Sequence, residues 1–281
     1  QRGMLAYHGT PHQFPPTDAN PLGEFDHAKM GTGEGAQAYG HGTYLAERQG
    51  VAKDYQDTLT RQKARYEIDG VGVNESGLHN DISRTVMEKS PASSLQAYSI
   101  TTKVMDGLSN GDSPAHYRRF LEKNRHDLPD MESWEVDGTI AALKRAEEYK
   151  RIAPEGSLYT VDLPDEHIAN MLDWDAPLSE QPESVRNAFL STPAARRLSQ
   201  IDADAREAFG ADLYPDDWTK DLTGSSLYKE MGEDAGKASH NLNQLGIPGI
   251  KYWDGGSRSA GEGTRNFVVF DPTIAKILER K

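Results

Sequence analysis

Near the start of the chain, hydrophobic and polar positions follow the two-residue alternation of β-strands. Met4 to Tyr7 predicts a short first strand, and the glycine and proline of His8-Gly9-Thr10-Pro11 predict a turn directly after it. Gly42 to Ala46 predicts a second strand, and Glu47 to Tyr55 has a composition compatible with a helix. We therefore expect His8 at the end of a strand.

Three more strands are predicted in the second half of the chain. Ser157 to Leu163 alternates apolar and polar side chains and stops at Pro164, which predicts a strand with one buried face. Ile247 to Trp253 and Asn266 to Phe270 are the last strong strand candidates. A glycine-rich loop, residues 255 to 263, separates these two strands.

Between the strands, the pattern favours helices. Residues 63 to 155 are charged, with Ile140, Leu143, Ala146 and Tyr149 at three-residue spacing. Residues 164 to 222 form a second, acidic segment punctuated by prolines. A further helix is predicted to pack on the sheet through Leu227, Met231, Ala238, Leu242 and Leu245. We interpret 63–155 and 164–222 as helical insertions in a single domain, residues 1–281.

Residues 15 to 42 are rich in glycine, proline and polar side chains, and we expect a long loop there. Within it, Gly31-Thr32-Gly33-Glu34-Gly35 lacks the GxGxxG register and the lysine-serine ending of phosphate loops. The expected role of this glycine run is a flap over a ligand pocket.

Composition narrows the class of protein. A chain of 281 residues with 36% hydrophobic residues can bury a sizeable core. A formal net charge of -13 without long runs of one sign disfavours duplex nucleic acid as a partner. The absence of cysteine excludes disulfides, a thiolate nucleophile and a cysteine zinc site. No apolar run approaches the roughly 20 residues that span a membrane, and the first residues do not resemble a signal peptide.

Two common types of site are not expected. His8 and His12 have the spacing of paired zinc ligands, but Pro11 interrupts any helix and no glutamate follows His8. Ser257 and Ser259 lie among glycines without the GxSxG pattern of a nucleophilic serine. We therefore predict neither a metal site nor a serine nucleophile.

Other residues suit cleavage of the bond between nicotinamide and ribose. That reaction needs a site that holds the nicotinamide ring flat, grips its carboxamide through backbone groups and stabilises an oxocarbenium-like ribose. The glycine after His8 lets a ligand approach bare backbone, and Tyr44 and Tyr55 can face a planar ring. A polar residue on a third strand, Asn266, could hold ribose hydroxyls.

These residues lie in blocks that resemble, in order, the motifs of the PARP-like ADP-ribosyltransferases, whose signature is a histidine, a tyrosine and a glutamate on three strands. The blocks are Tyr7-His8-Gly9-Thr10, Gly40-His41-Gly42-Thr43-Tyr44-Leu45-Ala46-Glu47 and Asn266-Phe267-Val268-Val269-Phe270-Asp271. Tyr55 follows Tyr44 by eleven residues, the offset of the family's second stacking tyrosine.

The resemblance implies an α+β fold with a split antiparallel β-sheet of the ADP-ribosyltransferase type, which clasps NAD⁺ between its halves and carries helical insertions. By resemblance, His8 bonds the adenosine-side ribose, and Gly9 bonds the carboxamide through its backbone. The implied catalytic residues are His8, Tyr44 and Asn266, and the implied NAD⁺-binding residues are His8, Gly9, Thr10, Tyr44 and Tyr55.

Two positions depart from the family pattern. Asn266 stands where the family's polymerases have the catalytic glutamate, and an amide can orient a ribose hydroxyl but cannot stabilise positive charge. Chain elongation is therefore not expected. Ala52 replaces a serine that the family uses on the carboxamide. Glu34 or Glu262 could supply a carboxylate if its loop folds back over the pocket.

The function implied is transfer of one ADP-ribose from NAD⁺, as co-substrate and without a metal, to a macromolecular acceptor. The acidic balance favours protein over nucleic acid as that acceptor, and no membrane partner is expected. Two alternatives stay open: a NAD⁺ glycohydrolase, and an inactive NAD-binding module, which Asn266 invites. Because family members of this kind include secreted bacterial effectors, toxins and phage-delivered enzymes, the resemblance also fits an effector module that acts in a host cytoplasm.

Overall fold

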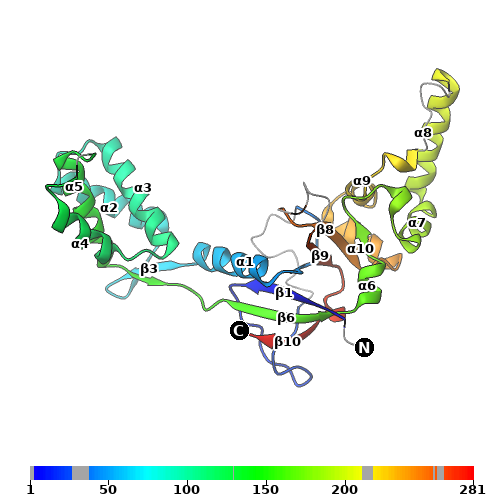
Figure 1. Cartoon of the computed structure of the whole chain (residues 1–281), viewed down its shortest axis with the longest axis horizontal. Helices are drawn as coiled ribbons and strands as arrows, with labels where there is room; N and C mark the ends of the chain where they lie inside the picture. The colour runs from blue at the N-terminus through cyan, green and yellow to red at the C-terminus, as the bar shows by residue number, and fades with distance from the viewer. Residues whose placement is uncertain (1–2, 27–37, 129, 211–217, 256, 258–262) are drawn as a thin grey trace. The chain divides into compact units, whose positions relative to one another are not determined.

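The computed structural model describes residues 3–26, 38–128, 130–210, 218–255, 257 and 263–281. The chain forms two compact units, and each is described by itself. Unit 1 comprises Gln1–Gln56 and Gly156–Lys281, and unit 2 comprises Asp57–Glu155. Figure 1 shows the helices and strands of both units.

Unit 1 is built on a β-sheet with helices. Its strands are β1 (Met4–Thr10), β2 (Thr43–Ala46), β6 (Ser157–Leu163), β7 (Leu172–Asp173), β8 (Gly249–Trp253), β9 (Arg265–Val269) and β10 (Lys276–Arg280). Its helices are α1 (Gln49–Gln62), which ends in unit 2, α6 (Asp165–Ala169), α7 (Glu183–Leu190), α8 (Pro193–Phe209), α9 (Gly224–Glu230) and α10 (Ala235–Gln244). Short 3-10 helices are η2 (Leu178–Glu180), η3 (Trp218–Lys220) and η4 (Pro272–Ile274).

The seven strands form one sheet in the order β10-β6-β1-β2-β9-β8-β7. The α+β class is confirmed, but the prediction of a wholly antiparallel sheet is wrong at one edge, where β7 runs parallel to β8. With only two residues, Leu172 and Asp173, β7 is too short to show an alternating pattern. It lies inside the segment 164–222 that we expected to be helical.

Strand β1 is longer than its sequence predicts. The glycine at position 9 indicates a turn, yet β1 continues to Thr10 and pairs with β6 at every position from Met4 to Thr10. His8 therefore lies within a strand and not at its end. A glycine in a strand is tolerated where another part of the backbone approaches closely, and α1 does so here.

Strand β6 is buried on both faces, not on one as predicted. Six of its seven residues are buried, because β1 and β10 pair with its two edges and apolar side chains pack on both of its faces. Tyr159, Val161 and Leu163 join one apolar cluster of the sheet. Leu158 packs on the opposite face with Ala52 of α1.

The helix predicted from Leu227 to Leu245 is two helices. Asp234 starts α10 by accepting a hydrogen bond from the Lys237 backbone N at 2.8 Å. A Cβ at Gly232 would lie 2.4 Å from the Ala238 backbone N, so only glycine allows this close turn. Both helices still pack on the sheet, through Leu227 and Leu242 among others.

Unit 2 is mainly helical, with α2 (Glu75–Lys89), α3 (Ser94–Asn110), α4 (Pro114–Asn124) and α5 (Ser133–Glu147). Side-chain caps fix three helix starts: Asn74 caps α2, Ser93 and Gln96 form a capping box on α3, and Ser113 caps α4. A small sheet, absent from the sequence prediction, joins β3 (Arg65–Ile68), β4 (Val71–Val73) and β5 (Lys150–Ile152).

No helix in the described ranges is long and apolar enough to cross a membrane.

Candidate functional site

The sheet of unit 1 opens between β1 and β2. These strands pair at one position only, Tyr7 opposite Ala46, whereas β1 pairs with β6 at seven positions and β2 with β9 at four. Beyond Tyr7, the ends of β1 and β2 therefore diverge without a backbone ladder between them. His8 and Tyr44, two of the residues predicted from the sequence, flank this opening.

His8 bridges the opening with its side chain. Its Nδ1 lies 2.8 Å from the carbonyl O of Tyr44 on β2. A carbonyl only accepts hydrogen bonds, so Nδ1 must carry the proton. Burial lowers the pKa of His8, and the bond to Tyr44 offsets this only in part. The imidazole is consequently neutral at pH 7, with Nε2 left as an acceptor.

Aromatic rings surround the His8 imidazole on its face of the sheet. The ring centroids of Phe25 and Phe14 lie 5.1 Å and 5.9 Å from that of His8, and Tyr159 lies at 6.5 Å. Phe14 also stacks on Tyr159 at 4.5 Å and donates its backbone N–H to the Tyr159 hydroxyl. The histidine is thus held in a fixed orientation by apolar neighbours.

The Tyr44 side chain projects from the opposite face of the sheet. Its hydroxyl donates to the Gly40 carbonyl at 2.7 Å and accepts from the Tyr39 backbone N at 3.3 Å. Burial raises the pKa of Tyr44, and the nearby Tyr55 hydroxyl raises it further. The hydroxyl is therefore neutral and committed to the preceding loop, and the ring face is what Tyr44 offers to a ligand.

Asn266 lies on β9, which pairs with β2 on the side away from β1. It is 9% exposed and stands directly opposite Ala46 on β2 and Tyr252 on β8. Burial raises the pKa of the Tyr252 hydroxyl, while hydrogen bonding with Asn266 acts to lower it. Since Tyr44 and Ala46 are two residues apart on β2, Tyr44 and Asn266 share one face of the sheet.

His8 and Tyr44 point to opposite faces of the sheet, because side chains alternate along each strand. His8 packs on the side of Ala6, Leu45 and Phe267, whereas Tyr44 packs on the side of Tyr252 and Val268. A ligand that touches both side chains would therefore have to reach both faces of the sheet. An elongated molecule with two recognisable halves fits this requirement.

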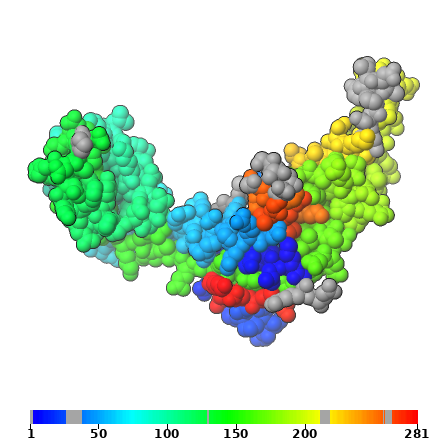
Figure 2. Space-filling view, in the orientation of Figure 1, coloured from blue at the N-terminus to red at the C-terminus, as the bar shows by residue number. Residues whose placement is uncertain are grey.

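Gly9 and Thr10 are held by packing. A Cβ at Gly9 would lie 1.8 Å from the carbonyl O of Ala52 and 2.9 Å from the Gln56 backbone N, so α1 lies directly on this glycine. Figure 2 shows α1, in light blue, beside the dark blue of β1. The glycine is needed for the helix contact, and a ligand could reach only its in-plane backbone groups. Thr10 is buried and accepts a hydrogen bond from the His12 backbone N.

Tyr55 lies on α1 and is 52% exposed. Its hydroxyl acts on the pKa of both Tyr44 and Tyr252, which indicates that the three phenols are close together. Thus Tyr44, Tyr55 and Asn266, from β2, α1 and β9, lie near Tyr252 on one face of the sheet, whereas His8 of β1 lies on the opposite face.

Three residues at this place were missed by the sequence analysis. Tyr39 stacks on Tyr252 with ring centroids 3.9 Å apart. Glu47 follows β2, and its carboxylate accepts the Arg265 backbone N–H at 2.6 Å. Glu47 ends the second motif block, a signal that could have identified it, whereas Tyr252 gives no sign beyond its place in a predicted strand.

Arg265, next to Asn266 on β9, forms an ion pair on the opposite face of the sheet. Its guanidinium pairs with Asp173 of β7 at 3.2 Å and lies 3.4 Å from the centroid of the Trp253 ring. Asp173 is 8% exposed, so this ion pair is largely buried on the Asp173 side. Burial lowers the pKa of the neighbouring Lys251.

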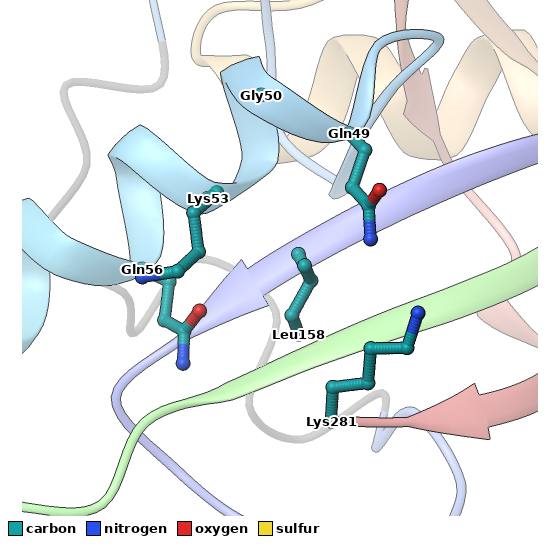
Figure 3. A pocket seen from close by; sticks show the side chains of 6 residues that line it. All are labelled: Gln49, Gly50, Lys53, Gln56, Leu158 and Lys281. Atoms are coloured by element: carbon teal, nitrogen blue, oxygen red, sulfur yellow. The ribbon is translucent and has the colours of Figure 1, made fainter.

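A separate hollow of about 450 Å³ lies between α1, β6 and the end of the chain. Figure 3 shows its lining: Gln49, Gly50, Lys53, Gln56, Leu158 and Lys281. None of the sequence-predicted site residues lines it. The predicted flap at 31–35 and the proposed carboxylates Glu34 and Glu262 lie outside the described residues.

Comparison with protein-family models, curated proteins and solved structures finds no match to this chain. Within the described ranges, no group of three or more histidine, aspartate or glutamate side chains is arranged to hold a metal ion.

Proposed function

We propose that unit 1 binds NAD⁺ through the opening between β1 and β2 and transfers one ADP-ribose from it to a macromolecular acceptor, with protein favoured. The observation that carries this proposal is the placement of His8, Tyr44 and Asn266 on the neighbouring strands β1, β2 and β9, with His8 bonded to the Tyr44 carbonyl across the opening. The order of the motif blocks and the eleven-residue spacing of Tyr44 and Tyr55 support it.

The geometry suits the two halves of NAD⁺. On one face, the unprotonated Nε2 of His8 can accept a hydrogen bond from a ribose hydroxyl. On the other face, Tyr44 and the exposed ring of Tyr55 can hold the flat nicotinamide. The split sheet of the ADP-ribosyltransferase type, with NAD⁺ between its halves, is part of this proposal.

In the proposed reaction, the bond between the ribose C1′ and the nicotinamide nitrogen breaks, and its electron pair leaves with nicotinamide. A nucleophilic atom of the acceptor bonds to C1′ and loses its proton to water. Asn266 orients a ribose hydroxyl through its amide, as a neutral group. Without a carboxylate at this position, turnover is expected to be slow and limited to one transfer.

The first test is binding. In a calorimetric NAD⁺ titration, His8→Ala and Tyr44→Ala should each weaken affinity by about tenfold or more, which corresponds to roughly 1.4 kcal/mol. Tyr44→Phe keeps the ring and should bind far better than Tyr44→Ala. Tyr98→Ala, which removes an exposed tyrosine of unit 2, is the matched control. Unchanged affinity in folded His8→Ala and Tyr44→Ala proteins would remove the site from consideration.

The second test is turnover. The protein is incubated with NAD⁺ labelled in its adenine half, with and without cell lysate, and labelled macromolecules and free nicotinamide are measured. Labelled protein in the presence of lysate supports transfer. Nicotinamide release without any labelled acceptor supports a NAD⁺ glycohydrolase.

Asn266 also favours a second candidate function, an inactive module that binds NAD⁺ without cleaving it. Binding with neither label transfer nor nicotinamide release would support this candidate. Asn266→Glu restores the carboxylate found in the family's polymerases and should raise nicotinamide release if the pocket is otherwise competent. No gain in an Asn266→Glu protein that binds NAD⁺ would argue against a catalytic role for this position.

A further inference from the structure

Unit 2 contains a hollow of its own, about 680 Å³ in volume, bordered by α3, α4 and α5. Pockets for small molecules in proteins typically have volumes of about 300–1,000 Å³. Every residue that lines this hollow belongs to unit 2. The NAD⁺ proposal does not involve it, and the two stand independently.

The floor of the hollow is apolar. It is formed by buried side chains of α3 and α5: Ile100, Val104, Leu108 and Leu143. Such a surface binds a hydrocarbon body by removing it from water.

A glycine of α3 leaves room above this floor. A Cβ built on Gly107 would meet only the Asp112 side chain, with Oδ2 at 3.4 Å. The Asp112 carboxylate therefore lies beside the space that the missing side chain of Gly107 leaves open.

The rim of the hollow is acidic. Asp112 and Asp130 line it, and neither forms a salt bridge with another described residue. Glu135 and Lys103 also line it and pair with each other at 3.7 Å, and the His116 side chain lines it as well. With this pair neutralised, the two aspartates leave the rim negative, which favours a cationic ligand.

An aromatic ring completes the lining. Tyr117 of α4 lines the hollow, is 45% exposed, and stacks with Phe120 at a centroid distance of 6.3 Å. The face of an aromatic ring attracts ammonium groups. An apolar floor, an aromatic wall and carboxylates without ion-pair partners are together the features that recognise an organic cation.

We propose that the hollow of unit 2 is a binding site for organic ammonium ions, with the apolar body of the ligand on Ile100, Val104 and Leu108 and its ammonium group at Asp112, Asp130 and Tyr117. The ammonium group could belong to a free amine or to a lysine side chain of a peptide. No chemistry on the ligand is proposed.

The test uses the full chain and three probes of similar size: 2-phenylethylammonium, neutral 2-phenylethanol and anionic 3-phenylpropionate. In ligand-observed NMR or calorimetric titrations, the ammonium probe should bind roughly tenfold or more tightly than the other two. Equal affinity of the three probes, or no binding of the ammonium probe at millimolar concentration, overturns the proposal. A capped phenylalanyl-lysine dipeptide is titrated in the same way. Tighter binding of the dipeptide than of 2-phenylethylammonium would identify a lysine side chain as the ligand, and weaker binding would identify a free amine.

Variants of the lining residues test whether the ammonium ion binds in this hollow. Asp112→Asn with Asp130→Asn should reduce ammonium binding and leave 2-phenylethanol unaffected, because only the charge is removed. Gly107→Leu should abolish binding of both by filling the hollow, in a helix where leucine is favourable. Asp106→Asn, on α3 but outside the hollow, is the control. Ammonium binding that persists in the folded double variant refutes the site.

Discussion

The two units place their polar side chains on different supports. In unit 1, His8, Tyr44 and Asn266 stand on adjacent strands, and strand pairing fixes which side chains share a face. In unit 2, Asp112 and Tyr117 stand on helices and a loop around a hollow, with an apolar floor beneath them. In unit 1 the order of the strands decides which side chains lie together, whereas in unit 2 the packing of the helices decides which side chains line the hollow.

The largest effect is expected where α1 rests on β1. Gly9→Val should destabilise unit 1 by about 3 kcal/mol or more, because the new side chain would overlap the Ala52 backbone, which cannot move aside. Urea denaturation measures this. Gly50→Ala on the same helix, where no atom lies within 4 Å of the new Cβ, should be neutral or slightly stabilising. A Gly9→Val protein as stable as the wild type would contradict the close contact.

The next effect distinguishes the cores of the two units. Leu121→Ala removes a fully buried side chain of α4 and should cost about 3 kcal/mol. Hydrogen exchange read by mass spectrometry should show faster exchange in α2 to α5 and unchanged exchange in the sheet of unit 1. Leu95→Ala, at a 77% exposed position, should have little effect. Equal acceleration in both units would mean that they unfold as one.

A smaller effect is expected at the edge of the large sheet. Arg265→Met removes the ion-pair partner of the buried Asp173 and should destabilise unit 1 by about 2 kcal/mol, reduced from a fully buried pair because Arg265 is partly exposed. Lys237→Met breaks an exposed pair with Glu233 and should cost less than about 0.5 kcal/mol. Similar urea midpoints for the two variants would show that the ion pair of Arg265 with Asp173 stabilises unit 1 no more than the exposed pair does.

The smallest effect is a pH dependence. The folded protein holds the pKa of His8 below the usual value of 6.5, so below that value the unfolded chain binds more protons. The contribution of His8 to the stability of unit 1 should therefore be fully present above pH 6.5 and be lost as the pH falls through the lowered pKa of His8. His8→Asn should reduce the slope of the melting temperature against pH in the acid range. An unchanged slope would show that His8 is not responsible.

The sequence predicted much of unit 1, for identifiable reasons. The strands at 42–46, 157–163 and 266–270 have alternating or continuous apolar patterns, and the structure confirms each within one residue. His8, Tyr44 and Asn266 lie in short blocks of sequence, and the structure places these blocks on three neighbouring strands. Their roles stay predictions.

Other features depend on contacts that no local pattern records. Gly9 suggested a turn because its tertiary partner, the backbone of α1, is 43 positions further along the chain at Ala52. Tyr252 and Asn266 meet through the pairing of β8 and β9. Strand β10 and the small sheet of unit 2 were missed because their strands are short or carry charged residues. The hollow of unit 2 depends on how the helices pack, and the spacing of apolar residues along the sequence does not predict that packing.

The pairing of β3 with β5 has a consequence for how this chain could have been assembled. Arg65 stands opposite Ile152, so the first and last strands of unit 2 lie next to each other. A segment whose two ends are neighbours can be gained, lost or exchanged in one genetic event, because the host chain needs only a tight turn to close the gap. The helical unit is in this sense a separable insertion. Its proposed ammonium site could be altered or removed without changing the pairing of the strands in the seven-stranded sheet of unit 1.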